Sequence, residues 1–169
     1  MKIEEPTIKQ SNNPEKSLQE ALFTYLSDFG KEREIDYVIL KEFGLDIAVF
    51  YNKSGIPSSR FIEVKTYVGS RQGGVGIGNS QGNGIQVDLL LHSHEKLALF
   101  DNSILWVLGY GLQPIGSARY KIFSSVDAKN AAMSGVKRGK QNNLKISALS
   151  NDLVTWEELL TRVSRFVFD

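Results

Sequence analysis

The sequence has no cysteine and only two histidines among its 169 residues. The absence of cysteine excludes disulfide bonds and thiolate metal sites. Long hydrophobic runs are also missing: the longest, at residues 104–112, is too short to span a bilayer. The first ten residues lack the apolar core of a signal peptide. We therefore expect a soluble, cytoplasmic protein that does not bind a membrane.

The chain has little net charge, but its charged residues are unevenly distributed. The formal net charge is +1, which by itself indicates no partner. Residues 1–50 hold six basic and ten acidic residues, whereas residues 114–150 hold seven basic residues and one acidic residue. A basic segment can present a local surface to an anion such as nucleic acid, although composition alone favours a solvated loop.

The 41% hydrophobic content predicts one compact domain over residues 1–169.

The first part of the chain predicts a helix followed by three strands. Apolar residues recur at three- and four-residue intervals over residues 14–29, with Asn13 as a candidate N-cap and Gly30 as the expected end of the helix. The turn-rich sequence NKSGIPSS, residues 52–59, separates the strands expected at 45–51 and 60–67 and predicts a hairpin between them. The three strands are expected at residues 36–41, 45–51 and 60–67.

The remainder of the chain begins with a glycine-rich segment and then alternates helices and strands. Seven glycines within residues 69–84 predict a flexible loop rather than a packed element. No repeat or linker divides the chain, so we predict an α/β fold with a central mixed β-sheet flanked by helices. The further elements are a helix near 93–100, strands at 103–110 and 117–123, a helix-like stretch in 124–143 that ends in a polar loop, a short strand at 144–149 and an amphipathic helix at about 151–166.

Two opposite charges interrupt the apolar run FIEVKTY at residues 61–67. On a strand, Glu63 and Lys65 share one face, while Ile62 and Val64 share the other. Burying a charge is costly unless it is paired or serves a metal ion. A structural Glu–Lys pair on an exposed edge strand is the alternative to a functional role.

Asp46 lies near the start of the second strand of the expected hairpin. If the two strands are antiparallel neighbours, Asp46 lies beside Glu63 and Lys65 at one end of the sheet. The two carboxylates would then hold a hard cation such as Mg²⁺, and the lysine would orient or help to deprotonate a water molecule and stabilise developing charge. These residue types together suit the hydrolysis of a phosphodiester bond.

The order of these elements resembles the PD-(D/E)XK nuclease superfamily. The matching features are a helix, a strand, a strand with Asp46, a turn, and then Glu63, Val64 and Lys65 on the next strand. The resemblance covers residues 14–67, and the usual proline before the aspartate is absent. It implies a restriction-endonuclease-like core, metal ligation by Asp46, Glu63 and the backbone carbonyl of Val64, and catalysis with Mg²⁺, for which Mn²⁺ can substitute.

Many members of this superfamily carry a further acidic residue, for which the chain offers three candidates. Glu42 precedes Asp46 by four residues, and some restriction enzymes place an acid at that position. Glu15 and Gln19 lie nearer the inner face of the expected helix, whereas Glu20 lies almost opposite its apolar face and is expected to face solvent. We rank Glu42 first, with Glu15 and Glu20 behind it.

Polar residues further along the chain are candidates for DNA contacts. The glycine-rich segment lacks the GxxxxGK[ST] pattern of a phosphate loop, and a contact with the DNA backbone and a disordered surface loop are equally supported. The two histidines lack a third metal ligand, so an imidazole near DNA is the favoured interpretation. Lys and Arg can bind phosphates or guanine, and Asn and Gln can pair with adenine. The candidates are Arg71, Gln72, Asn79, Gln81, Gln86, His92, His94, Lys137, Arg138, Lys140, Gln141, Asn142 and Asn143.

Together these patterns favour a Mg²⁺-dependent DNA endonuclease. The leading hypothesis is a type II restriction endonuclease that cuts double-stranded DNA as a homodimer, because one subunit of this size cuts one strand. A cognate methyltransferase acting on the same DNA site is a candidate partner. Two alternatives stay open: a structure-selective nuclease, such as a Holliday-junction resolvase or DNA repair nuclease, and a catalytically silent DNA-binding module of the same fold.

Overall fold

The structure is a computed structural model that describes residues 14–41, 46–67, 76–77, 102–110, 115–127, 144–145 and 153–169. Its helices are α1 (Pro14–Glu32), the 3₁₀-helix η2 (Ile115–Ser117) and α4 (Trp156–Phe168). Its strands are β1 (Tyr37–Lys41), β2 (Ile47–Lys53), β3 (Ile56–Tyr67), β4 (Gly76–Ile77), β5 (Ile104–Tyr110), β6 (Arg119–Ser124) and β7 (Leu144–Lys145).

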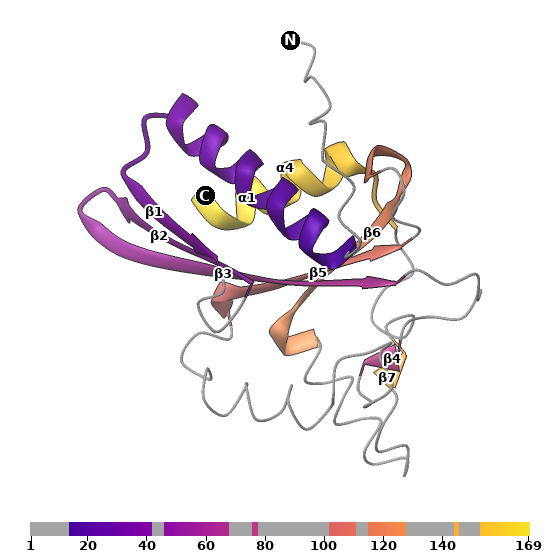
Figure 1. The fold of residues 1–169 in the computed structure, drawn as a ribbon. Helices are drawn as coiled ribbons and strands as arrows, with labels where there is room; N and C mark the ends of the chain where they lie inside the picture. The colour runs from indigo at the N-terminus through magenta and orange to yellow at the C-terminus, as the bar shows by residue number, and fades with distance from the viewer. Residues whose placement is uncertain are drawn as a thin grey trace.

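Five of the strands form one mixed sheet in the order β1-β2-β3-β5-β6. β3 and β5 are parallel, and the other neighbouring pairs are antiparallel. Helices α1 and α4 lie on the same face of this sheet (Figure 1). The predicted α/β class, with a mixed sheet and flanking helices, is confirmed at this level. None of the described helices is both long and apolar enough to cross a membrane.

The core lies between the two helices and the sheet. Ile62 and Val64 of β3 are fully buried and pack against both helices, as the alternation in FIEVKTY predicts. Leu22 and Leu26 of α1 are also fully buried, and burial of a side chain of this size contributes about 1.5–3 kcal/mol. Glu63 and Lys65 therefore lie on the opposite face of β3, whereas Arg60 shares the helix-bearing face and donates a hydrogen bond to the Phe166 carbonyl of α4.

Helix α1 does not end at Gly30, as the sequence predicted, but continues to Glu32. Gly30 is required by close packing instead. A Cβ atom at this position would lie 2.4 Å from Cε1 of Tyr37, whose hydroxyl donates a hydrogen bond to the Ser27 carbonyl at 2.7 Å. The small residue therefore allows the start of β1 to pack directly on α1.

The β2–β3 hairpin is tighter than the predicted loop over residues 52–59. Ser54 and Gly55 have φ values of 53° and 83°, the left-handed conformation that two-residue hairpin turns use. The Gly55 amide donates a hydrogen bond to Oδ1 of Asn52 at 2.7 Å. β3 consequently begins at Ile56, and its 12 residues run from the hairpin to the predicted catalytic residues.

Helix α4 begins at Trp156, not near residue 151 as predicted. Thr155 and Glu158 form a capping box, in which each side chain accepts a hydrogen bond from the other's backbone amide. The residue before the cap, Val154, pairs with Tyr120 through two backbone hydrogen bonds. Extended pairing with β6 and the capping box together set the start of the helix.

The remaining predictions have mixed outcomes. Strands β5 and β6 confirm two expected strands, although Ser117 belongs to η2 and Ser124 to β6. Gly76–Ile77 pairs with Leu144–Lys145, so the prediction of an unpaired loop is wrong for this part of the glycine-rich segment. Three further predictions concern residues outside the described ranges. They are the N-cap at Asn13, the helix expected at 93–100 and residues 128–143 of the helix-like stretch.

Candidate active site

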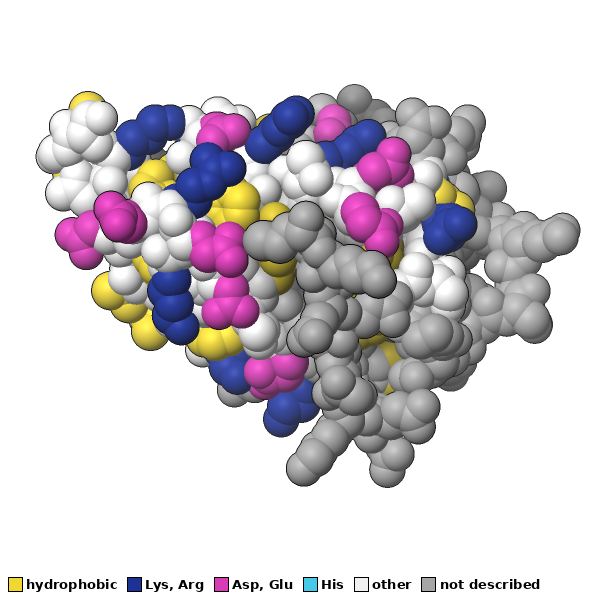
Figure 2. Space-filling model, turned by 90° about the horizontal axis from the view of Figure 1, so that it is seen from above, with side chains coloured by type: hydrophobic (Ala, Val, Ile, Leu, Met, Phe, Trp, Pro, Cys, Tyr) yellow, Lys and Arg dark blue, Asp and Glu magenta, His cyan; other side chains and the backbone are white. Residues whose placement is uncertain are grey.

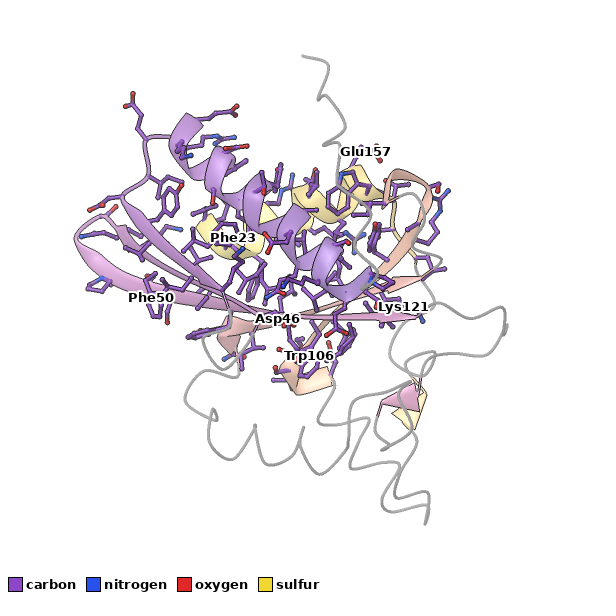
Figure 3. The ribbon with its side chains drawn as sticks, in the orientation of Figure 1. Phe23, Asp46, Phe50, Trp106, Lys121 and Glu157 are labelled. Carbon is purple, nitrogen blue, oxygen red and sulfur yellow. The ribbon has the colours of Figure 1, made fainter. Side chains whose placement is uncertain are left out.

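Four charged side chains from three segments converge beside the C-terminal part of β3. Glu63 and Lys65 come from β3, Asp46 directly precedes β2, and Glu15 belongs to the first turn of α1. Figure 3 shows Asp46 at the level of the sheet, below α1. The antiparallel pairing of Ile47 with Ile62 brings Asp46 next to the Glu63–Lys65 segment. The predicted proximity of these three residues is therefore borne out by the geometry.

The Lys65 ammonium group lies at the centre of this cluster. Its Nζ atom lies 2.8 Å from Oε1 of Glu63, 3.5 Å from Oε1 of Glu15 and 3.9 Å from Oδ2 of Asp46. Only 15% of the Glu63 side chain and 28% of the Lys65 side chain are exposed. Three carboxylates thus surround one ammonium group, which leaves a formal charge of −2 when all four groups are ionised.

Asp46 is held by a hydrogen bond at each of two positions. Its Oδ2 atom accepts one from the backbone amide of Val64 at 2.6 Å. Its backbone carbonyl accepts another from Nε2 of Gln19 at 2.7 Å. Asp46 is therefore connected to both β3 and α1. Helical geometry predicted that Gln19 lies near the inner face of the helix, but Gln19 was not among the predicted site residues.

The surroundings shift the protonation equilibria of the two β3 residues. Burial raises the pKa of Glu63 above its ordinary value; the Lys65 charge opposes this rise, and the Asp46 charge adds to it. Burial alone would lower the pKa of Lys65, but the negative charges of Glu63, Asp46 and Glu15 outweigh it, so this pKa is raised. Lys65 is consequently an ammonium group at neutral pH.

Trp106 on β5 is a buried aromatic residue, 5% exposed, and the cross-strand neighbour of Glu63. It lies directly opposite Glu63 in the parallel β3–β5 pairing, so the two side chains share one face of the sheet. Its ring stacks on Phe123 with centroids 5.9 Å apart, and its indole N–H donates a hydrogen bond to Oγ of Ser125 at 2.9 Å. A rigid aromatic surface next to a carboxylate reduces its hydration and favours its neutral form.

Among the predicted auxiliary acids, the structure places Glu15 in the cluster. Glu20 instead pairs with Lys41 at 2.7 Å near the surface, as its expected exposure suggests. Glu42 lies outside the described residues. Glu15 and Glu20 are only five residues apart on α1, but they lie on different sides of the helix and pair with Lys65 and Lys41, respectively.

The donor set is suitable for a divalent cation. Within the described parts of the chain, no group of three Asp, Glu or His side chains is placed to hold a metal ion. Mg²⁺, however, commonly takes one or two protein carboxylates and completes its shell with water. Asp46 and Glu63 approach the same ammonium group, supply hard oxygen donors and belong to a cluster with excess negative charge. These residues therefore fit Mg²⁺, whereas the role of the Val64 carbonyl stays a prediction.

The predicted DNA-binding residues lie outside the described part of the chain. They are Arg71, Gln72, Asn79, Gln81, Gln86, His92, His94, Lys137, Arg138, Lys140, Gln141, Asn142 and Asn143. Figure 2 views the helix-bearing face and shows acidic and basic side chains interspersed across its described surface. This mixture of charges does not favour a polyanion on the described part of that face.

Comparisons of the chain with protein-family models, curated proteins and solved structures found no match.

Proposed function

We propose that this protein is a metal-dependent endonuclease that hydrolyses phosphodiester bonds in DNA through a PD-(D/E)XK-type site. The observation that carries this proposal is the convergence of Asp46 and Glu63 on the Lys65 ammonium group. The connectivity of the sheet supports a restriction-endonuclease-like core, since an antiparallel β1-β2-β3 meander is followed by a parallel crossover to β5.

Each residue of the cluster has a role in this proposal. Asp46 and Glu63 would hold Mg²⁺, with the Val64 carbonyl as a further oxygen ligand. A bound Mg²⁺ would supply positive charge that offsets the negative charge developing on the phosphate. Lys65 would donate a hydrogen bond that orients the attacking water, and its raised pKa favours this donor role over that of a general base.

A purely structural ion cluster is the alternative interpretation of the same residues. Buried ion pairs contribute little to stability even when their charges balance, because desolvation offsets the Coulomb attraction. In this cluster the charges do not balance, and the raised pKa of Glu63 means that its surroundings disfavour its ionised form. Such a cluster contributes little to the stability of the folded protein, but its excess negative charge is suitable for binding a cation.

The leading substrate hypothesis is double-stranded DNA cut by a homodimeric type II restriction endonuclease. The test is to incubate the purified protein with plasmid DNA and with synthetic four-way junctions, each in Mg²⁺ and in EDTA. Discrete plasmid fragments in Mg²⁺ are expected, and cutting of junctions alone would favour a structure-selective nuclease. Lys65→Ala is the matched negative control. Absence of cleavage by the wild-type protein, or equal cleavage by this variant, would contradict the proposed mechanism.

A further inference from the structure

Gln19 is a buried amide in the helix surface that packs against the sheet. Its exposed fraction is 6%, and its neighbours Leu18 and Leu22 on α1 are fully buried. A buried amide is costly unless its polar atoms are hydrogen-bonded. Its Nε2 atom donates to the Asp46 carbonyl at 2.7 Å, across 27 positions in the sequence. Burial of Gln19 is therefore coupled to the position of Asp46.

Asp46 depends on this bond because it lies outside the regular strand pairing. The β1–β2 and β2–β3 pairings include Ile47 but not Asp46. Gln19 holds the backbone carbonyl of Asp46, and the Val64 amide holds Oδ2. The two bonds orient both the backbone and the carboxylate of Asp46.

We infer that Gln19 is a positioning residue that holds Asp46 in the orientation required for divalent-cation binding. The inference rests on the proposed function, because it assigns the cation to the same cluster. Gln19 acts through Asp46, since its amide is bonded to the Asp46 backbone. Glu15 lies one helical turn earlier and reaches Lys65, so the first two turns of α1 contact the cluster twice.

This role predicts a specific loss when the amide is removed. Gln19→Met keeps a similar shape and apolar stem but cannot donate to the Asp46 carbonyl. Replacing a hydrogen-bonding partner of a metal ligand typically weakens metal binding by about 10- to 100-fold. We expect a loss of this size in affinity, together with a small decrease in thermal stability.

The experiment measures cation binding directly and does not require cleavage. Tb³⁺ prefers hard oxygen ligands, and its luminescence is sensitised by a nearby tryptophan, a position that Trp106 holds opposite Glu63. The full-length wild-type protein and Gln19→Met are titrated with Tb³⁺, and Mg²⁺ is then added as a competitor. Ser164→Ala is the matched control, because Ser164 is 5% exposed and its hydroxyl donates only within α4, to the Thr161 carbonyl.

The expected result is wild-type affinity in Ser164→Ala and an affinity about 10- to 100-fold weaker in Gln19→Met. Unchanged affinity in folded Gln19→Met, or an equal loss in Ser164→Ala, would overturn the inference alone. No Mg²⁺-displaceable signal from the wild-type protein would overturn the metal site and the inference together. If Gln19→Met does not fold, Gln19→Asn is tested in its place, since its amide is one methylene too short to reach the carbonyl.

Discussion

Two lysine–carboxylate pairs of this protein have almost the same separation but very different surroundings. Lys41 and Glu20 lie 2.7 Å apart and join β1 to α1, with side chains that are 36% and 42% exposed. Lys65 and Glu63 lie 2.8 Å apart, but two further carboxylates share this lysine, and Glu63 is only 15% exposed. Burial and the balance of charge therefore distinguish the two pairs, whereas the distance between the charged groups does not.

The physical consequences of the two pairs differ. An exposed pair such as Lys41–Glu20 contributes about 0–1 kcal/mol and weakens as salt is added. The Lys65 cluster has excess negative charge in a partly desolvated position, and the pKa of Glu63 is raised as a result. A divalent cation would compensate this charge. The comparison thus predicts that changes in the Lys65 cluster affect cation binding and catalysis, whereas changes in the Lys41 pair affect only stability.

The largest expected difference is between Lys65→Ala and Lys41→Ala in DNA cleavage. Loss of Lys65 should reduce the cleavage rate by about 10²- to 10⁴-fold, because the water would lose its orienting donor and the phosphate a stabilising charge. Lys41→Ala should cut at nearly the wild-type rate. The measurement is the initial rate on plasmid DNA at saturating Mg²⁺, with circular dichroism to verify folding. Similar rates in the two variants would remove the functional distinction between the pairs.

A smaller effect is expected for Asp46→Asn, which removes one negative ligand and keeps its shape. Mg²⁺ affinity should fall by about tenfold or more, because the amide oxygen of asparagine can still coordinate the ion but lacks the negative charge of the carboxylate. Glu20→Gln, the matched change in the exposed pair, should bind Mg²⁺ normally. Isothermal titration calorimetry measures both affinities. Full cleavage activity in EDTA would rule out the metal mechanism.

The pH dependence of the protein's stability should reveal the raised pKa of Glu63. Its pKa is raised in the folded protein, so the folded state binds this proton more tightly than the unfolded state does. Without metal, this contribution to stability is fully present below the ordinary value of 4.5 and is lost as the pH rises through the raised pKa. Thermal melts in EDTA between pH 4 and 8 should show this loss in the wild-type protein and less of it in Glu63→Gln. Identical pH profiles would contradict the assignment.

The smallest expected effect concerns the stability of the exposed pair. Glu20→Gln should lower the free energy of unfolding by no more than about 1 kcal/mol, and added salt should reduce the difference. Urea denaturation at low and high salt measures this change. A loss well above 1 kcal/mol that persists at high salt would contradict the interpretation of Lys41–Glu20 as an exposed, weakly stabilising pair.

The difference between Glu15 and Glu20 also shows the limit of prediction from sequence. Helical periodicity predicted that Glu20 faces away from the core, and its surface pair with Lys41 agrees. Glu42, ranked first, lies outside the described residues, and of the two described auxiliary candidates it is Glu15 that reaches Lys65. Periodicity identifies the face of a helix, but it cannot identify the strand residue that lies opposite that face.

The sequence by itself determined the alternation of β3 and the antiparallel β2–β3 hairpin that brings Asp46 beside Glu63 and Lys65. Both follow from local rules, because side chains alternate every residue along a strand and a short turn returns the chain beside itself. Only the tertiary structure decided that α1 supplies Glu15 and Gln19 to the same cluster. Their contacts join residues 50 and 27 positions apart, and the packing of α1 on the assembled sheet creates them.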